Sequence, residues 1–589
     1  TVDPNDIESM DVLKDGSAAA IYGTRGSAGV ILVTTKSGKK GKAVVEYSGT
    51  AATESVARTI PIMNADEYRA LPGSNDLGSN TDWFDAVTKT GVSFVNNLSI
   101  SGGNEGTSYR MSLNSRNVEG VGINSGFDQL NARLNLTQRA LKDKALFSIN
   151  ISNTTADRQF GNDNSFRYAI ISNPTLPIYD PNPQTPNFGG YAERDIFDWF
   201  NPVSIAEQNI NDGREGRLLT SIRGEYNFTD NFKVSAFYSS QRETFWNGSY
   251  SPKTAKFGGG FGRKGLATVQ NNETLNDLFE ATANYEQSVG KLNMSFLGGY
   301  SYQEFFYQGD YTQAGNFLTD AFTYNNLGAA LDFANGLASV YSYASENKLV
   351  AFFGRANFNF DDTYLLSISS RYEGSTRFGE NNKWGLFPAV SAGVNLANLV
   401  DITGVNALKV RASYGRTGTQ PGESYISLLR YGRQGNFFYN GAFVPSYGPV
   451  SNNNPDLSWE TKDEVNVGLD FVAFNNKLSG TIDYFTRVTS GMILPINVPV
   501  PPNLFPTTLL NIGEVENSGL EVLLNYSVID KSDFKWTTGV NFSTLATNLR
   551  SLSAGDLSFG AVNYRSNFGS PGQNLTQLIR VQENGPLGQ

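Results

Sequence analysis

The sequence predicts an all-β fold, a transmembrane antiparallel β-barrel, and three observations carry this prediction. Apolar and polar residues alternate over most of the 589 residues, which is the pattern of strands with two different faces. Short polar turns and long loops follow one another between the strands. Charged residues make up only 17% of the chain and aromatic residues 12%, yet apolar residues form no long runs. Strands that face lipid on one side and a polar lumen on the other have this composition.

The alternation of apolar and polar residues begins near residue 43. In the segment 129–139, Leu130 and Leu134 fall on one face, whereas Asn131 and Arg133 fall on the other. The same pattern recurs in residues 147–152, 355–360, 408–414 and 464–471. Counting such segments along the chain gives about seventeen strands.

Two kinds of connection join the strands. The short ones are polar turns at residues 227–231, 361–363 and 474–477. The long ones, rich in Gly, Pro, Asn and aromatic residues, are residues 158–213, 247–275, 307–345 and 416–462. A soluble β-sandwich also alternates, but it rarely carries a long loop after every second strand. Short turns at one rim and long loops at the other are typical of an outer-membrane barrel.

Both ends of the chain suggest that the protein continues beyond them. Residues 583–589 have the composition of a loop, whereas a barrel needs an even number of strands and cannot leave an open edge in lipid. We therefore expect further strands after Gln589. Residues 1–5 show neither the basic start nor the apolar run of a signal peptide, so we expect the N-terminus to precede Thr1.

Composition excludes several classes of function. No segment approaches the roughly 20 apolar residues of a membrane-spanning helix, and the most apolar short run, residues 29–33, has the length of one strand. The net charge of −10 argues against nucleic-acid binding, which needs a basic surface. Cys and His are both absent, which excludes disulfides, thiol catalysis, imidazole bases and zinc sites built from these residues.

The first forty residues differ from the rest. Residues 7–14 predict a short strand, and residues 17–22 predict a helix with Asp15 as its N-cap and Gly23 at its end. A turn at residues 25–29 leads into an apolar strand from residue 30 to residue 33. A unit of this size cannot bury a core by itself, so it forms the end of a small domain that packs against something else.

Three motifs in this region closely resemble the end of the plug domain of TonB-dependent receptors, nearest to the SusC-like branch of Bacteroidota. They are DIESMDVLKD at residues 6–15, AAAIYG at 18–23 and GVILVTTK at 29–36. Further motifs of the same branch follow in order at residues 80–84, 97–103, 371–379, 384–388, 411–415, 418–420, 454–461 and 513–521. The resemblance therefore covers essentially the whole chain.

The resemblance implies a domain organisation. Residues 1–40 would be the C-terminal part of an α+β plug domain, and residues 41–589 an outer-membrane β-barrel that is incomplete at its C-terminal end. A complete member has about 22 strands, so about seventeen of them would be present here. A complete member also carries an N-terminal extension, a TonB box and most of the plug before the position of Thr1, and it ends in a β-signal.

The resemblance also implies a function, which is active import of a bulky nutrient, an oligosaccharide or a peptide, across the outer membrane. A SusD-like surface lipoprotein would close over the barrel, and TonB would pull on the segment before Thr1. We expect no cofactor, no metal and no enzymatic activity. Three alternatives stay open: a passive channel, a polysaccharide-degrading enzyme on a β scaffold, and a barrel that serves a larger secretion or surface assembly.

Two aromatic segments are candidates for ligand binding, because aromatic rings pack on sugar faces or peptide side chains while Asn supplies hydrogen-bonding groups. The candidate residues are Phe245, Trp246, Tyr250, Phe437, Phe438 and Tyr439. The alternatives, which together outweigh a ligand role, are contact with a partner lipoprotein and simple packing of the loops. Glu8 and Arg25 are candidates for plug–barrel contacts, with pairing inside the plug as the alternative.

Two apparent catalytic motifs are weak. Residues 260–265 match G-x-G-x-x-G, but no βαβ unit surrounds them, so a loop explains them better than a dinucleotide site. The carboxylate pairs Glu514/Glu516 and Asp463/Glu464 could suggest a glycosidase, which needs carboxylates facing each other across a cleft. Nothing in the sequence suggests a cleft there, so solvated or lumen-facing charges are favoured.

Overall fold

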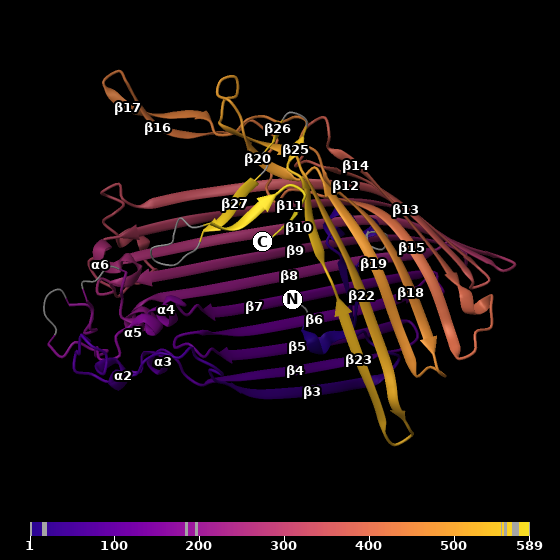
Figure 1. Ribbon diagram of the computed structural model, residues 1–589, viewed down its shortest axis with the longest axis horizontal. Coiled ribbons are helices and arrows are strands. Elements are labelled where there is room, and N and C mark those ends of the chain that lie inside the picture. The colour runs from indigo at the N-terminus through magenta and orange to yellow at the C-terminus, as the bar shows by residue number, and fades with distance from the viewer. Residues whose placement is uncertain are drawn as a thin grey trace.

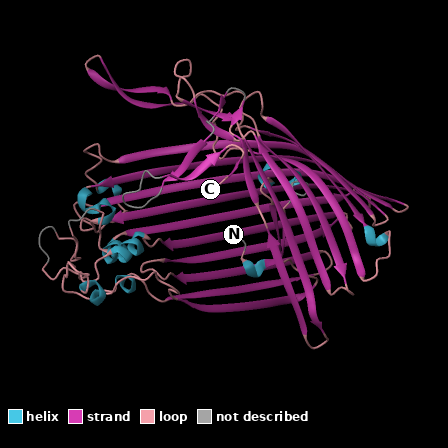
Figure 2. Ribbon diagram, in the orientation of Figure 1, coloured by secondary structure: helices cyan, strands magenta, loops and turns pink. Residues whose placement is uncertain are grey.

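The computed structural model describes residues 3–14, 20–182, 187–194, 198–554, 557–558, 562–567 and 577–587. One large antiparallel sheet curls around a lumen (Figure 1), and short helices gather mainly at one end of its strands (Figure 2). None of the described helices has the length and apolar character needed to cross a bilayer. The predicted all-β antiparallel barrel fold is confirmed.

Among the described residues, seventeen strands of nine or more residues form the wall, in agreement with the number counted from alternation. They are β3 (Gly41–Glu54), β4 (Gly91–Gly103), β5 (Thr107–Glu119), β6 (Gly126–Ala140), β7 (Ala145–Gln159), β8 (Ile210–Asn227), β9 (Phe232–Ser251), β10 (Leu266–Val289), β11 (Leu292–Gly315), β12 (Ser339–Phe360), β13 (Tyr364–Ser375), β14 (Trp384–Asn395), β15 (Val405–Thr419), β18 (Glu460–Ala473), β19 (Leu478–Ser490), β22 (Glu514–Asp530) and β23 (Lys535–Ser543).

The other elements lie outside or at the margin of the wall. The remaining strands are β1 (Ile7–Leu13), β2 (Val30–Thr35), β16 (Tyr431–Tyr439), β17 (Ala442–Pro449), β20 (Ile493–Asn497), β21 (Thr507–Asn511), β24 (Ala546–Ser551), β25 (Ser553–Ala554), β26 (Leu557–Ser558), β27 (Val562–Asn567), β28 (Gln577–Gln582) and β29 (Gly585–Pro586). The helices are η1 (Pro4–Asp6), η2 (Ala20–Tyr22), η3 (Thr24–Gly26), α2 (Ala65–Arg69), α3 (Trp83–Ala86), α4 (Asn164–Ile171), α5 (Pro202–Gln208), η4 (Phe257–Gly259), α6 (Gly260–Arg263), η5 (Leu327–Ala329) and η6 (Leu396–Asn398).

The wall strands pair with their neighbours in chain order. Antiparallel registers join each strand to the next from β3 to β23, and β22 also pairs with β24, which pairs with β29. The strand order returns to β3 through that two-residue element. Every residue of β3 and of β23 is exposed, as at the margins of a sheet. The expectation that the barrel continues beyond Gln589 stays a prediction.

The strands of the middle of the wall are longer than a membrane requires. β10 and β11 pair without a break over 24 residues each, which is about 80 Å at 3.3 Å per residue, whereas a membrane crossing takes about ten residues. The predicted loops 247–275 and 307–345 are therefore too long, because the strands continue to Ser251 and Gly315 and resume at Leu266 and Ser339. Polar residues on both faces hide this extension from the alternation pattern.

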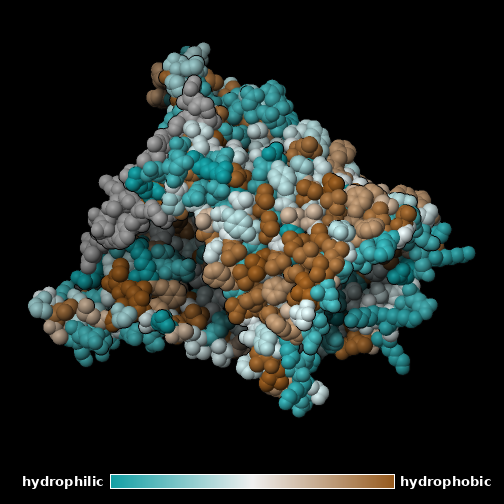
Figure 3. Space-filling view, turned by 45° about the vertical axis from the view of Figure 1, so that its right-hand side comes forward, coloured by the Kyte–Doolittle hydropathy of each residue, from teal (hydrophilic) through white to brown (hydrophobic). Residues whose placement is uncertain are grey.

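The two faces of the wall differ in chemistry. Apolar side chains such as Leu98, Leu130, Ile222 and Phe279 are more than a third exposed, and they point away from the lumen. Figure 3 shows apolar residues gathered in a broad band, with hydrophilic residues toward its edges. The opposite, lumen-facing positions of the same strands are mainly polar, as the alternation predicts.

At the end of the wall where the long loops lie, those loops form a packed layer. Its core contains Trp83, Val87, Trp199 and Val203, which are at most 8% exposed. The indole nitrogen of Trp83 donates to the carbonyl oxygen of Asn173 at 2.9 Å, which ties the loop between β3 and β4 to the loop between β7 and β8. The long loops are thus folded elements.

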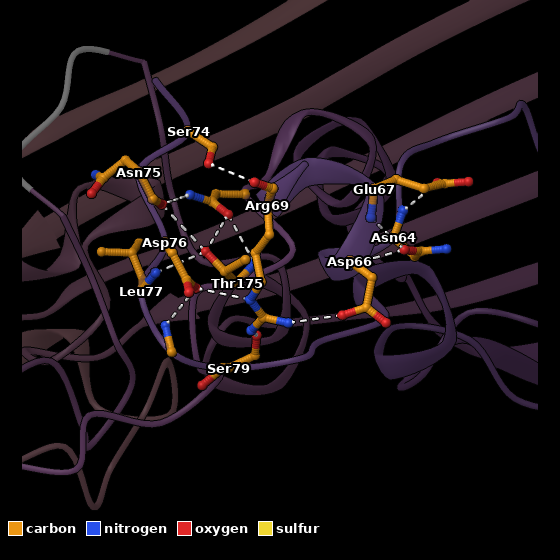
Figure 4. Close-up of polar contacts among 12 residues, drawn as sticks. Asn64, Asp66, Glu67, Arg69, Ser74, Asn75, Asp76, Leu77, Ser79 and Thr175 are labelled. Atoms are coloured by element: carbon orange, nitrogen blue, oxygen red, sulfur yellow. Dashed lines mark hydrogen bonds and ion pairs between the residues drawn. The ribbon is translucent and has the colours of Figure 1, made fainter. Parts of the chain in front are cut away.

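A polar network supports the same layer (Figure 4). The guanidinium of Arg69 lies 3.1 Å from the carboxylate of Asp66 and 3.2 Å from that of Asp76, and it donates to the carbonyl oxygen of Ser79 at 2.6 Å. The hydroxyl of Thr175 reaches the carbonyl oxygen of Asn75 at 3.3 Å. The Arg69 contacts fix the loop between β3 and β4, and the Thr175 contact joins it to the loop between β7 and β8.

The first forty residues form a separate small unit, called the N-terminal segment here (residues 3–40). β1 and β2 pair with each other and with no wall strand among those described, which confirms the two predicted strands. Of the predicted helix at residues 17–22, residues 17–19 and the proposed cap Asp15 lie outside the described residues, and Ala20–Tyr22 forms the 3-10 helix η2. The turn predicted at residues 25–29 begins with a second 3-10 helix, η3.

Candidate functional site

The N-terminal segment contacts the lumen-facing side of the wall at several separate places. We call this side the inner face. Since successive residues of a strand point to opposite faces, one contact fixes the facing of every other residue in that strand and, through the registers, in its neighbours. The contacts involve β5, β6, β11, β13, β15, β18, β19 and β22.

The first contact is a buried ion pair. Asp6 and Arg110 of β5 have side chains 7% and 8% exposed, and their charged atoms lie 3.2 Å apart. The hydroxyl of Ser112 donates to the other oxygen of the Asp6 carboxylate at 2.5 Å, and Glu46 of β3 lies 3.4 Å from the same guanidinium. A buried carboxylate with two donors is well satisfied, and removing either charge leaves the other buried and unpaired.

A second contact centres on β13. Arg371 and Glu373 form an ion pair on the inner face, with side chains 8% and 1% exposed. The hydroxyl of Thr24 donates to the other carboxylate oxygen of Glu373, and Arg371 donates to the carbonyl oxygen of Ile21 at 3.3 Å. Gly23 has a φ of +86°, and a Cβ there would lie 3.0 Å from the Arg371 guanidinium. The close approach therefore requires glycine.

Two further contacts use lysines. Lys14 lies 2.7 Å from the carboxylate of Glu521 on β22, with side chains 64% and 34% exposed. Arg487 of β19 donates to the carbonyl oxygen of Lys14 at 3.3 Å. On β18, the ammonium of Lys462 donates to the carbonyl oxygen of Ser27. These contacts are more exposed to solvent than the pairs at Asp6 and Glu373, so each contributes less to holding the segment against the wall.

The two residues predicted to join plug and barrel, Arg25 and Glu8, differ in their contacts with the wall. The guanidinium of Arg25 sits 5.0 Å from the ring centre of Phe305 on β11, which is a cation–π contact with the inner face. Glu8 is exposed, and no hydrogen bond or ion pair joins it to the wall in the part of the chain that the structure describes. The wall partners Arg110, Arg371 and Glu373 were not expected from sequence, although an Arg-x-Glu pair with both charges on one strand face was a usable signal.

The first group of predicted ligand residues lies on β9 and not in a loop. Phe245 and Trp246 point to opposite faces of the strand. Phe245 faces inward, with its ring centre 6.5 Å from that of Phe160. Trp246 faces outward, with its ring centre 5.4 Å from that of Tyr324. Tyr250 is 2% exposed, and its hydroxyl donates to Asp320 at 2.6 Å. The structure therefore does not bring these three side chains together.

The second group stands on a projecting hairpin. Phe437, Phe438 and Tyr439 end β16, which pairs with β17 and extends away from the wall in Figure 1. Their side chains are 49%, 63% and 67% exposed. Such exposed rings at the end of a hairpin are available to a ligand or to a partner surface.

Two cavities lie on the inner face, and the N-terminal segment lines one of them. One of about 890 Å³, at the short-turn end, is lined by polar side chains that include Asn357, Ser391 and Lys409. A second of about 590 Å³ lies against residues 12–14. The two share Arg411 and Asn466, so a polar surface runs along the wall past the segment.

The carboxylate pairs that could suggest a glycosidase are engaged in ion pairs. Arg550 lies 2.8 Å from Glu514 and 3.0 Å from Glu516. Arg416 lies 2.8 Å from Asp463, and Arg487 lies 2.9 Å from Glu464. These pairs agree with the structural interpretation of the four carboxylates. Residues 260–265 begin with the one-turn helix α6 between two wall strands.

The family model described as TonB dependent receptor-like, beta-barrel matches residues 148–578. The chain belongs to this family and is an outer-membrane β-barrel protein.

Curated relatives extend the same likeness. The chain is 32% identical over 576 residues to TonB-dependent receptor P3 of Formosa agariphila, and 29% identical over 592 residues to TonB-dependent receptor SusC of Bacteroides thetaiotaomicron. These alignments cover 94% of this chain but 56% and 58% of the two relatives, so the chain spans little more than half of their length.

Solved structures share the fold. The RagAB peptide transporter superposes with a TM-score of 0.83 at 22% identity, covering 100% of this chain and 68% of that one. The ferric citrate transporter FecA superposes with a TM-score of 0.55 at 9% identity, covering 93% and 66%. The architecture of the wall is therefore that of TonB-dependent outer-membrane transporters.

Proposed function

We propose that the chain is the channel subunit of an active importer, in which residues 1–40 are the last part of a plug domain and residues 41–589 belong to the barrel around it. TonB, coupled to the inner membrane, would pull on a segment that precedes Thr1 and shift the plug, so that a bulky nutrient passes. No covalent chemistry is part of this proposal.

The observation that carries the proposal is the way in which the N-terminal segment is held. It touches the inner face through several separate polar contacts, with Asp6 and Thr24 at the two most buried of them, and none of its described residues belongs to a buried apolar cluster. The exposed pair of Lys14 and Glu521 contributes about 0 to 1 kcal/mol, and even a buried pair is lost once its two charges separate, whereas apolar burial resists separation over its whole area. A stopper held by discrete polar contacts can be released stepwise by a pulling force.

We propose a SusD-like surface lipoprotein as the partner at the long-loop end, and an oligosaccharide or a peptide as the nutrient. The likeness to SusC supports the partner, and the exposed aromatic hairpin β16–β17 and the packed loop layer offer surfaces at that end of the wall. A passive channel and a barrel of a secretion assembly are the other candidates. The segment inside the lumen speaks against an open channel.

An engineered disulfide tests the proposal. The hydroxyls of Ser27 and Thr419 lie 3.1 Å apart across the boundary between segment and wall, and the chain has no cysteine of its own. In the full-length protein, the pair Ser27→Cys and Thr419→Cys is expected to abolish nutrient uptake by cells under oxidising conditions and to recover it with a reductant. Thr419→Cys alone is the control.

Uptake that persists with the disulfide formed would contradict a moving plug. Conductance in planar bilayers gives an independent measurement: the intact protein should be nearly silent, and a steady open pore would favour the passive channel.

A further inference from the structure

Four tyrosines form a group on the inner face of β11 and β12, near the long-loop end. Tyr307 and Tyr311 stand on β11, and Tyr341 and Tyr343 on β12. Their inward orientation follows from Phe305, which stands two residues before Tyr307 on the same strand face and lies under Arg25 of the N-terminal segment. The register pairs Tyr311 with Tyr341. We call these four residues the tyrosine cluster.

The rings of the tyrosine cluster lie close together, with one stacked pair and two tilted ones. Tyr311 and Tyr341 are stacked with centres 4.9 Å apart at 19°. Tyr343 lies 6.3 Å from Tyr341 at 32° and 5.5 Å from Tyr307 at 35°. The hydroxyls of Tyr307 and Tyr343 are 3.2 Å apart. The result is a continuous aromatic surface that spans two strands.

A glycine allows the central ring to cross a strand. Gly309 is the register partner of Tyr343, and the Tyr343 hydroxyl donates to Asn272 of β10 at 2.6 Å. A Cβ on Gly309 would lie 2.6 Å from that hydroxyl and 2.5 Å from the Asn272 oxygen. Tyr343 therefore leans across β11 in a position that only glycine permits.

Charge is segregated around the tyrosine cluster. The inner-facing polar residues of β10 to β12 near it are uncharged, namely Gln270, Asn272, Thr274, Gln313, Ser345 and Asn347. The outward positions of the same stretches carry the charges, namely Glu273, Asp277, Glu304, Asp310, Glu346 and Lys348. On the inner face of β9, the carboxylate of Glu243 lies 2.8 Å from Arg217.

We propose that the tyrosine cluster, together with Asn272, binds the sugar rings of a neutral oligosaccharide in the lumen. The proposal rests on the import function proposed above and selects one of its two nutrient classes. Aromatic faces pack against the C–H groups of a sugar ring, and amide and hydroxyl groups match its hydroxyls. A charged peptide or an acidic glycan would find no opposite charge on the four tyrosines or on Asn272, and Arg25, over Phe305 farther along β11, is already engaged with that ring.

The cluster has more exposed ring surface than sheet packing requires. Cross-strand aromatic pairs stabilise a sheet by themselves, and the stack of Tyr311 on Tyr341 does so here. Tyr307 and Tyr341 are nevertheless 38% and 53% exposed, and they face the lumen, where lipid cannot cover them. A molecule transported through the lumen is therefore what we expect to cover these rings.

Binding of the full-length protein in detergent to an array of neutral oligosaccharides, acidic oligosaccharides and peptides tests the proposal. The neutral oligosaccharide that binds best is then titrated by calorimetry against three variants. The double variant Tyr341→Ala with Tyr343→Ala should lose about tenfold or more in affinity. Tyr343→Phe keeps the ring and should lose less. Tyr302→Ala, which removes an outward tyrosine of β11, should bind as the parent does.

Binding confined to neutral oligosaccharides and weakened only by loss of the inner rings supports the proposal. Three results overturn it: no neutral oligosaccharide binds, charged ligands bind better, or the double variant binds as well as the parent. Because binding is measured on purified protein, it stands apart from the uptake test of the disulfide pair. A cluster that binds sugar in a protein whose uptake ignores the disulfide would contradict only the import mechanism.

Discussion

Two regions of the inner face are built from opposite chemistry. The region that holds the N-terminal segment is charged, with buried pairs at Arg110 and Glu373 and exposed ones such as Lys14 with Glu521. The region of β10 to β12 around the tyrosine cluster is uncharged and aromatic. Fixed charges hold one defined partner in register, whereas aromatic faces can pack against the sugar rings of oligosaccharides of varied sequence. Under the two proposals above, the charged region would hold the plug and the aromatic region would bind the transported molecule.

The largest effect is expected from Glu373→Gln. The change removes the carboxylate that pairs with Arg371 and accepts from Thr24, and it leaves a nearly buried guanidinium without its counter-charge. Breaking such a pair costs about 3 to 5 kcal/mol. Hydrogen exchange in residues 20–36 of the full-length protein should accelerate strongly. Glu346→Gln, which breaks an outward and exposed ion pair, is the control. If residues 20–36 exchange equally fast in both variants, the distinction between the two regions does not hold.

A smaller effect is expected from Gly309→Ala. The new methyl group would press on Tyr343, on Asn272 and on the carbonyl oxygen of Asn271, and overpacking of this kind costs about 1 to 3 kcal/mol. Thermal unfolding in detergent measures it. Gly298→Ala on the same strand, where a Cβ meets nothing within 4 Å, should leave the unfolding temperature almost unchanged. A tolerated Gly309→Ala would mean that Tyr343 is free to move and that the cluster is not preformed.

The loop layer is expected to respond to pH through Glu193. Burial raises the pKa of this carboxyl from 4.5 to about 7, and the nearby Lys256 and the backbone N–H of Asn201 oppose the rise. A raised carboxyl pKa favours the folded state at low pH, and this contribution is lost as pH rises from 4.5 to about 7. The protection factors of residues 198–208, which correct the exchange rates for the intrinsic pH dependence of amide exchange, should therefore fall over that interval. In Glu193→Gln the protection factors should lose this pH dependence, and a parent protein without it would contradict the assignment.

The smallest effect is expected from Lys14→Ala. This residue also joins the segment to the wall, but its side chain is 64% exposed, and such pairs contribute about 0 to 1 kcal/mol. Exchange in the segment should change little, and salt should abolish what change there is. A loss as large as that of Glu373→Gln would show that exposure does not rank these contacts.

The candidate site was only partly predictable from sequence. Arg25 meets the wall, whereas Glu8 stays exposed. The sequence placed residues 247–275 in a loop, whereas β9 continues to Ser251, because polar residues on both faces erase the alternation there. Consecutive residues of a strand face opposite sides, so Phe245 and Trp246 lie on different faces, and a ligand role for either stays a prediction.

The sequence by itself determined the barrel, the number of its long wall strands among the described residues and the family, because alternation and turn chemistry are local and repeat with every strand. Only the tertiary structure decided which residues meet. Thr24 reaches Glu373 across 349 positions of the chain, and Tyr343 reaches Asn272 across a glycine of the strand between them. Such pairings depend on strand register and on the curl of the wall, which no local pattern encodes.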